Sequence, residues 1–306
     1  MQQRFTSQHV SEWRDTGFVL IPDFFTPAEI APIHEDFETL YADRGQGEGV
    51  GTELNKKKPG EIGAISRRQF LNFDQMPYAA SPAVNLISLH PQLIAFARAL
   101  LGVDAVHCYQ SHTWAKFTGE ADYDQAFHCD YGNHTLTVPS DEISWRTVDF
   151  IIYVSDVTDD LGALHYVTKQ DCAEVLGDGV LTPPAEKQMA LKARERSAAA
   201  PSGSLLAHSI DTMHRGTNLT RPHGRRFTMT MGYKAAGNEM IGFHVWQFAP
   251  DRPWEQILNH ATPQQLAVIG IPLPGDRFWT EHTLTLTQQR WPQWNMQAYR
   301  DARRLD

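Results

Sequence analysis

The sequence predicts a mainly β protein with helical additions (α+β), folded as a double-stranded β-helix, the jelly-roll or cupin-like barrel, with N-terminal and C-terminal helices. Three observations support this prediction. Short β-branched or aromatic segments, bounded by Gly, Asp or Pro, follow one another between about residues 104 and 240. Helix-capping signatures lie on both sides of that region. Inside it, a histidine and an aspartate stand two residues apart, at His128 and Asp130.

The length of 306 residues suits a single domain, because barrels with helical additions often reach this size. We expect a helical N-terminal part at residues 1–103, a jelly-roll core at about 104–240 and a C-terminal extension at 241–306. Hydrophobic residues make up 42% of the chain and charged residues 21%, which is typical of a folded protein rather than a disordered one.

Charge and cysteine content restrict the class of partner. The net charge of −9 leaves no basic stripe to neutralise phosphates, so nucleic acid is not expected. Three widely spaced cysteines without a CxxC pair disfavour a disulfide framework or a zinc ribbon and suit a reducing compartment. No apolar run of about 18 residues suggests a membrane span. We therefore expect a cytoplasmic protein with a small-molecule substrate; the sequence leaves the oligomeric state open.

The N-terminal part is predicted to alternate helices with a strand. Thr26 followed by Pro27 and Glu29 is a capping signature, because a threonine side chain accepts from the first free amides and proline suits the first helical position. The predicted elements are a helix ending at Gly17, a strand at 18–21, a helix from Thr26, a long loop at 46–80 (a lid or an irregular surface loop) and a helix from His90 to Gly102.

The middle of the chain reads as strands, and the end as helices again. The predicted strands are Val106–Gln110, Thr147–Val154, Ala163–Val167 and Phe227–Met231. Residues 190–200 are a connecting helix or loop. A second capping signature begins at Thr262, and Trp291, Trp294 and Tyr299 are expected to pack the last helix onto the body.

The spacing of His128 and Asp130 indicates a metal site. On an extended strand, residues two apart project from the same side, so an imidazole and a carboxylate would point together. His214 is favoured as the third ligand over His208, because Gly216 and Asn218 supply a turn directly after it. Two histidines and one carboxylate on one face of a metal, with the other positions open, are typical of a non-haem Fe(II) oxygenase.

An arginine downstream of His214 adds a second part to this site. If the co-substrate is 2-oxoglutarate, its far carboxylate needs a buried cation, and the planar guanidinium binds carboxylates bidentately without losing its charge. Arg225 and Arg226 are both candidates. Arg225 alternates with Phe227 and Met229, and we expect this apolar face to point into the barrel, so Arg225 is favoured.

With these residues in place, the sequence resembles the phytanoyl-CoA dioxygenase family of the Fe(II)/2-oxoglutarate-dependent oxygenase superfamily, over roughly residues 6–240. The motifs are loose one by one, and their order and spacing together are specific. They are Trp13 to Pro22, Phe25 to Ile30, Gln110-Ser111 with Lys116, Phe127 to Asp130, Ser155 to Thr158, Gly162-Ala163-Leu164, and His214 to Asn218 with Arg225.

The resemblance implies that His128, Asp130 and His214 bind Fe(II), that Arg225 anchors 2-oxoglutarate and that Gln110 helps to hold this co-substrate. O2 would take the last metal position, and the expected reaction is hydroxylation of a small, partly apolar metabolite with release of succinate and CO2. Asp130 argues against the halogenating branch, in which a small residue replaces the carboxylate. Desaturation and ring formation remain alternatives to hydroxylation.

Other features bear on the substrate mouth and on rival functions. Two departures from the family, Val167 to Gln170 and Arg215, are expected to reshape the mouth. Aromatic residues near the site either line an apolar pocket or belong to the core; they are Tyr109, Trp114, Tyr131, Trp145 and the segment 243–248. The alternative functions are a cupin-like metalloprotein of other chemistry, which needs no anchoring arginine, and a catalytically silent binding protein with the same fold.

Overall fold

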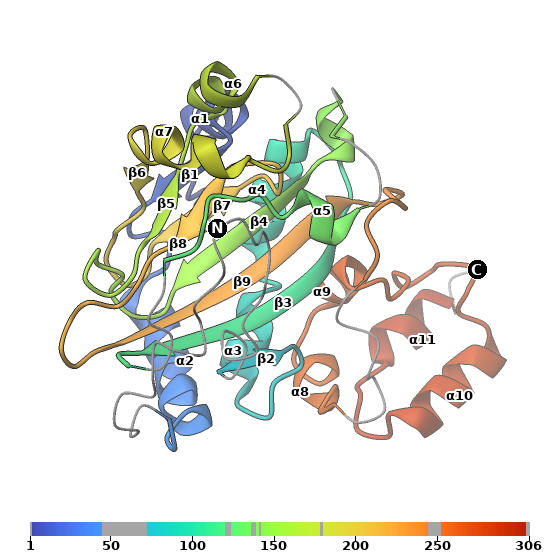
Figure 1. The fold of residues 1–306 in the computed structure, drawn as a ribbon. Coiled ribbons are helices and arrows are strands. Elements are labelled where there is room, and N and C mark those ends of the chain that lie inside the picture. The colour runs from blue at the N-terminus through green and yellow to red at the C-terminus, as the bar shows by residue number, and fades with distance from the viewer. Residues whose placement is uncertain are drawn as a thin grey trace.

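The computed structural model describes residues 2–44, 72–119, 124–135, 139–140, 142–177, 180–243 and 252–303. Two antiparallel sheets form the body of these regions (Figure 1). The larger sheet has the strand order β1-β7-β4-β9-β3-β2: β1 (Phe18–Ile21), β7 (Leu205–His208), β4 (Thr147–Tyr153), β9 (Arg225–Ala235), β3 (Val106–Phe117) and β2 (Phe73–Gln75). The smaller sheet has the order β6-β5-β8: β6 (Arg196–Ser197), β5 (Leu164–Tyr166) and β8 (His214–Gly216). Antiparallel sheets with helices at both ends confirm the predicted double-stranded β-helix architecture.

The helix boundaries predicted at Gly17, Thr26 and Gly102 are present, whereas α3 was not predicted. Thr26 caps α2 in a reciprocal arrangement with Glu29, and Gly17 and Gly102 end α1 and α4 in the left-handed conformation that favours glycine. The helices are α1 (Ser7–Thr16), α2 (Pro27–Leu40), α3 (Pro82–Ile87) and α4 (Pro91–Leu101). Among the described residues, Pro82–Leu101 is long and apolar enough to cross a membrane by length and composition alone. However, 67% of its apolar stretch is buried inside the body.

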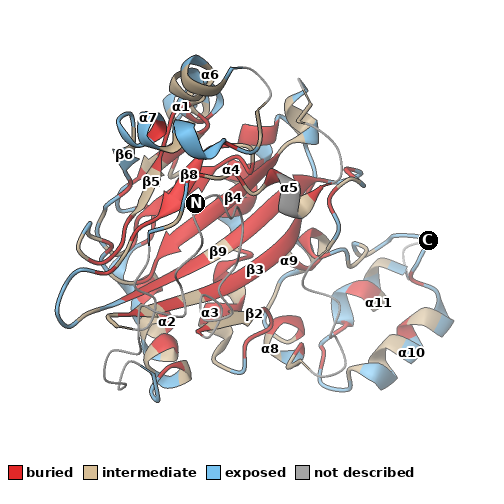
Figure 2. Cartoon of the chain, in the orientation of Figure 1, coloured by how far each residue is buried: buried red, intermediate tan, exposed pale blue. Residues whose placement is uncertain are grey.

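One face of the larger sheet packs against these helices. Phe227, Met229 and Met231 of β9 belong to the same buried cluster as Phe37 of α2 and Phe96 of α4. Figure 2 shows the central strands of the larger sheet, β7, β4 and β9, almost entirely buried. The apolar face of β9 therefore points to the helical layer, and the expectation that it points into the barrel is wrong. The dry core lies between the sheet and the helices, so the opposite face is free to carry polar residues.

That opposite face looks toward the smaller sheet and is called the inner face below. Tyr153 of β4 donates its hydroxyl to the carbonyl of Ala198, just after β6, at 2.6 Å. Arg226 of β9 donates to the carbonyl of Gly162, just before β5. The inner face of β9 carries Arg226, Thr228, Thr230 and Gly232, because side chains alternate along a strand.

The remaining helices lie between the strands or in the C-terminal extension. They are α5 (Tyr131–His134), α6 (Lys169–Leu176), α7 (Gln188–Lys192), α8 (Glu255–Leu258), α9 (Pro263–Val268), α10 (Glu281–Arg290) and α11 (Gln297–Arg303), with short 3-10 turns at Ile143–Trp145 and Ala185–Lys187. Trp294 and Tyr299 are buried against the main cluster, which confirms the predicted packing of the last helix. The predicted capping at Thr262 is also present.

Three expectations need separate comment. Residues 190–200 form the end of α7 and then β6, so the segment is neither one helix nor one loop. The possible lid at 46–80 lies mostly outside the described residues, which resume at Asn72 and include β2. The three cysteines are free, and Cys108 and Cys129 are buried.

Candidate metal centre

Three side chains meet at the edge where the segment before α5 pairs with β8. The backbone amide of His128 donates to the carbonyl of His214 at 3.0 Å, and the reverse bond is 2.9 Å, so the two residues form one bridge. Asp130 follows at the start of α5. One ligand atom from each of His128, Asp130 and His214 lies within 4.8 Å of the others.

Asp130 reaches this cluster by a different route from the one predicted. Its backbone is helical, with φ −84° and ψ 0°, so the period of two along an extended strand does not apply at this residue. The chain turns into α5 at Asp130, and this turn brings the carboxylate back toward the imidazoles. The predicted residues therefore meet, although the predicted reason is incomplete.

Each histidine is oriented by its second ring nitrogen. Nδ1 of His128 bonds to the carbonyl of Ala126 at 2.9 Å, and Nδ1 of His214 bonds to that of Thr212 at 3.0 Å. The Nε2 atoms of both histidines therefore point to Asp130. Nε2 of His128 lies 3.8 Å from one carboxylate oxygen, and Nε2 of His214 lies 3.5 Å from the other. Backbone carbonyls that fix imidazole tautomers in this way are usual around metal-ligating histidines. The donor set fits a small divalent cation.

The charge state of Asp130 suits a metal ligand. Burial opposes its ionisation, but the imidazoles around it, His214 and His128 first, hold the pKa of Asp130 below its ordinary value. An ionised carboxylate and two neutral imidazole nitrogens form the facial set that leaves open positions on Fe(II).

Arg215, one of the two departures from the family, braces this segment. Its guanidinium pairs with Glu195 at 2.6 Å and with Asp124 at 3.2 Å, and lies 5.7 Å from the ring centre of Phe127. Asp124 and Phe127 lie just before His128. Arg215 therefore ties β8 to the segment that carries the first ligand. At the other departure, Thr168 caps α6 by accepting from the amide of Asp171.

His208, the rival third ligand, lies beside the cluster and is not part of it. Its ring centre is 5.2 Å from that of His214, and its Nδ1 pairs with the hydroxyl of Tyr166 at 3.1 Å. Burial first, and His214 second, lower the pKa of His208 to about 3, so this imidazole is neutral. The structure brings His214 to Asp130, as the turn at Gly216 and Asn218 suggests.

The two arginines at the start of β9 point in opposite directions. Arg225 lies on the helical side of the sheet, and its side chain is 49% exposed. It pairs with Glu38 of α2 and lies over the ring of Phe227. Arg226 is on the inner face and only 5% exposed. Its Nε has no partner among the described residues. The structure therefore places Arg226, and not the favoured Arg225, inside the barrel.

Lys116 stands directly opposite Arg226 and received no role from the sequence. The two residues are paired across β3 and β9. Burial first, and the positive charge of Arg226 second, lower the pKa of Lys116 to about 7. The Lys116 ammonium lies near Gly216, two residues after His214, where an added Cβ would be 3.7 Å from it. Only the pairing with Arg226 indicates a role for Lys116, and this pairing depends on the strand register, which cannot be seen in the sequence alone.

Comparison with known proteins places this geometry in a family. The profile of the phytanoyl-CoA dioxygenase (PhyH) family matches residues 13–227, more than half of the chain. The chain belongs to the PhyH family. It is therefore an enzyme of the Fe(II)/2-oxoglutarate-dependent oxygenase type, with His128, Asp130 and His214 as the candidate triad. The family uses iron and 2-oxoglutarate and acts on small molecules. No curated protein matches the sequence significantly.

Solved structures share the fold of this PhyH-family chain. EctD from S. alaskensis with bound Fe has a TM-score of 0.56 at 19% identity, covering 83% of each chain. The epimerase SnoN, in complex with Fe3+, alpha ketoglutarate and nogalamycin RO, has a TM-score of 0.55 at 15% identity, covering 75% of this chain and 83% of its own. The carbocyclase SnoK from nogalamycin biosynthesis has a TM-score of 0.54 at 18% identity, covering 76% and 85%.

Gln110, the second residue expected to hold the co-substrate, lies away from Arg226. It pairs with Gly232 across β3 and β9, six residues along β9 from Arg226, or about 20 Å at the usual rise of a strand. Gln110 donates its amide to Asp149 of β4 at 2.9 Å. In this PhyH-family chain, Gln110 and Arg226 therefore occupy different ends of the inner face.

The aromatic residues predicted near the site divide into two groups. Tyr109 and Tyr131 are buried in one cluster with Phe127 and Cys129, so their rings are part of the core. Trp145 is exposed. Most of the segment 243–248 lies outside the described residues.

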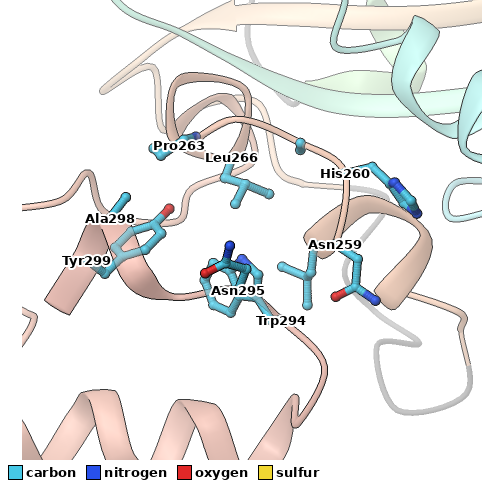
Figure 3. A pocket seen from close by; sticks show the side chains of 10 residues that line it. Asn259, His260, Pro263, Leu266, Trp294, Asn295, Ala298 and Tyr299 are labelled. Carbon is cyan, nitrogen blue, oxygen red and sulfur yellow. The ribbon is translucent and has the colours of Figure 1, made fainter. Parts of the chain in front are cut away.

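A hollow of about 240 Å³ lies elsewhere, in the C-terminal extension (Figure 3). Leu266, Trp294 and Tyr299 line it, together with other residues between 258 and 298. None of the triad residues is among them.

Proposed function

We propose that this protein is an Fe(II)- and 2-oxoglutarate-dependent dioxygenase that hydroxylates a small molecule and releases succinate and CO2. The observation that supports it most is the combination of the triad with two cations on the inner face, Lys116 and Arg226. A metal site alone is equally compatible with a cupin-like metalloprotein. Arg226 is buried and Lys116 is half-buried, and neither forms an ion pair with a residue of the described ranges. Two such basic side chains side by side suit the far carboxylate of 2-oxoglutarate.

The residues divide the work as follows. His128, Asp130 and His214 would hold Fe(II), which when bound supplies the activation of O2 and the oxidative decarboxylation of the 2-oxo acid. Arg226 binds the far carboxylate of 2-oxoglutarate, and the Nε that has no partner among the described residues becomes satisfied. Lys116 adds a second charge to the same carboxylate. Burial keeps water from these contacts, and so strengthens them.

The test is coupled turnover. Protein loaded anaerobically with Fe(II) and 2-oxoglutarate should show a visible charge-transfer band, and admitting O2 should release succinate, faster with members of a metabolite panel. Mass spectrometry should show one added oxygen in the product. A protein that binds metal yet neither binds nor consumes 2-oxoglutarate is a cupin-like metalloprotein instead. A protein that binds neither is a silent binding protein, and both results reject the proposal.

Lys116 gives this function a proton signature. At pH 7.5 a lysine of pKa about 7 is mostly neutral in the free protein. A bound carboxylate favours the charged ammonium and raises its pKa, so binding of 2-oxoglutarate should be accompanied by a net uptake of protons at this pH. Isothermal titration of the metal-loaded protein in two buffers of different ionisation enthalpy measures this uptake.

The control separates Lys116 from other titrating groups. Lys116→Met should remove most of the uptake, whereas Lys192→Met, at an exposed position of α7, should leave it unchanged. Equal uptake in the wild-type protein and in Lys116→Met would show that Lys116 does not meet the co-substrate.

A further inference from the structure

A row of polar residues crosses the inner face at the end away from Arg226. Asp149 of β4 pairs with His208 of β7 on one side and with Gly232 of β9 on the other. Gly232 in turn pairs with Gln110 of β3. The four positions form one row across four neighbouring strands. Asp149 is the one acidic residue in the otherwise apolar stretch Val148–Val154, and this was the available sequence signal for a site residue.

The row is built so that Asp149 reaches across a strand. A bulge in β3 between Cys108 and Gln110 lets Tyr109 and Gln110 both turn to the inner face. The hydroxyl of Tyr109 donates to Oδ1 of Asp149 at 3.0 Å, and Nε2 of Gln110 donates to the same oxygen at 2.9 Å. Gly232 lies between them. A Cβ there would be 2.4 Å from Oδ1 of Asp149 and 2.5 Å from the ring of Tyr109, so only glycine leaves the passage open.

The donors favour the charged form of the carboxyl. Nε2 of His112 faces the amide oxygen of Gln110 at 3.2 Å, so the nitrogen of that amide is the atom turned to Asp149. Two neutral donors stabilise a carboxylate but do not neutralise it. Asp149 is 2% exposed and forms no ion pair with any residue of the described ranges. Burial first raises the pKa of Asp149 to about 7, and the negative charge of Asp130 adds to the effect.

The basic side chains on the inner face either bind other groups or lie far from Asp149. Lys234, two residues beyond Gly232, donates to the carbonyls of Asn238 and Ile241. Lys116 and Arg226 lie about 20 Å along β9, at the usual rise per residue. A buried carboxylate without a cation is costly, and a ligand that supplies the cation recovers that cost.

The row adjoins the metal centre on the side opposite the co-substrate cations. The ring of His208 lies against that of His214, with 5.2 Å between centres. On the other flank, Nδ1 of His134, four residues after Asp130, is 2.9 Å from the hydroxyl of Tyr109. A co-substrate that runs from the triad toward Arg226 leaves this end to the substrate.

We propose that Asp149, held by Tyr109 and Gln110, is the specificity-determining residue of this site and binds a positively charged nitrogen of the substrate. The substrate class is then a small organic cation: an amine, an amidine or a guanidine. This inference rests on the proposed function, because it takes the triad as the reacting centre and Arg226 as the co-substrate anchor.

The experiment measures binding rather than turnover. Isothermal titration of anaerobic protein, loaded with Fe(II) and 2-oxoglutarate, compares matched cationic and neutral probes: benzylamine with benzyl alcohol, benzamidine with benzamide, and putrescine with 1,4-butanediol. The wild-type protein should bind at least one cation about tenfold or more tightly than its neutral partner, as expected for a buried charge pair. Asp149→Asn, which keeps the shape and one acceptor, should reduce that preference to less than about twofold.

Two controls keep the proposal falsifiable. The affinity of Asp149→Asn for 2-oxoglutarate should match that of the wild-type protein. If neither protein binds 2-oxoglutarate, the proposed function itself is rejected, whatever the preference for cations. Tyr109→Phe removes a competing donor and should retain the preference for cations; a merely structural network would lose it. No cation preference in the wild-type protein, or an unchanged preference in Asp149→Asn, would overturn the assignment.

Discussion

Replacing Asp130 with alanine should abolish stable Fe(II) binding and lower succinate release by about 10³-fold or more. Removing even a group that orients a ligand typically costs 10–100-fold in metal affinity, and Asp130 is itself the carboxylate of the set. Its oxygens lie 3.8 Å and 3.5 Å from the two imidazole Nε2 atoms, and it is the one carboxylate of this cluster among the residues that the structure describes. Metal content after anaerobic desalting, together with the charge-transfer band, measures the loss.

A surface aspartate supplies the matched control for this change. Asp104 is exposed, and Asp104→Ala should retain the full metal content and activity. The Asp130→Ala protein should still fold, because removing one of several charges around a metal site leaves both sheets intact. Stoichiometric Fe(II) in Asp130→Ala would show that the metal is held elsewhere.

Arg226→Met should raise the KM and the Kd for 2-oxoglutarate by about 100-fold, whereas Arg225→Met should change them by less than about twofold. Truncating one partner of a buried charge pair costs roughly 2–5 kcal/mol, while an exposed ion pair contributes about 0–1 kcal/mol. Arg226 is 5% exposed on the inner face, and Arg225 pairs with Glu38 on the helical side. Titration calorimetry and the dependence of succinate release on 2-oxoglutarate measure both effects.

Thermal denaturation separates anchoring from folding in this pair of variants. A ligand that binds only the native state raises the melting temperature, so 2-oxoglutarate should stabilise the wild-type and Arg225→Met proteins but not Arg226→Met. Arg226→Lys should recover part of the affinity, because it keeps the charge and loses the planar fork. A large loss in Arg225→Met, with Arg226→Met unaffected, would restore Arg225 as the anchor.

The contrast between these arginines shows how far a strand pattern can be interpreted. Alternation along β9 correctly separates Arg225 from Arg226, because neighbours on a strand face opposite sides. It does not say which side is the barrel. The apolar side of β9 packs on α2 and α4, as the shared cluster of Phe227, Phe37 and Phe96 shows, and so the polar side faces the metal centre. Because Arg225 and Arg226 are neighbours on the strand, choosing one instead of the other places the anchor on the opposite face of the sheet.

Local chemistry accounts for the features that the sequence predicts correctly. Threonine, proline and glutamate at the start of α2, and glycine after α1 and α4, act within one helical turn, so they need no knowledge of the rest of the chain. The ligand set is also local in part. His128 and Asp130 are neighbours, and a turn directly follows His214.

By itself, then, the sequence determined the fold class, the helix boundaries at Gly17, Thr26, Gly102 and Thr262, and the three residues of the candidate triad. Only the tertiary structure decided that Arg226 and Lys116 share the inner face, and that Asp149 reaches Tyr109 and Gln110 across Gly232. These contacts depend on strand register and on which face of the sheet meets the helices. Both are set by burial of the apolar face against residues distant in the chain, and no local pattern contains that information.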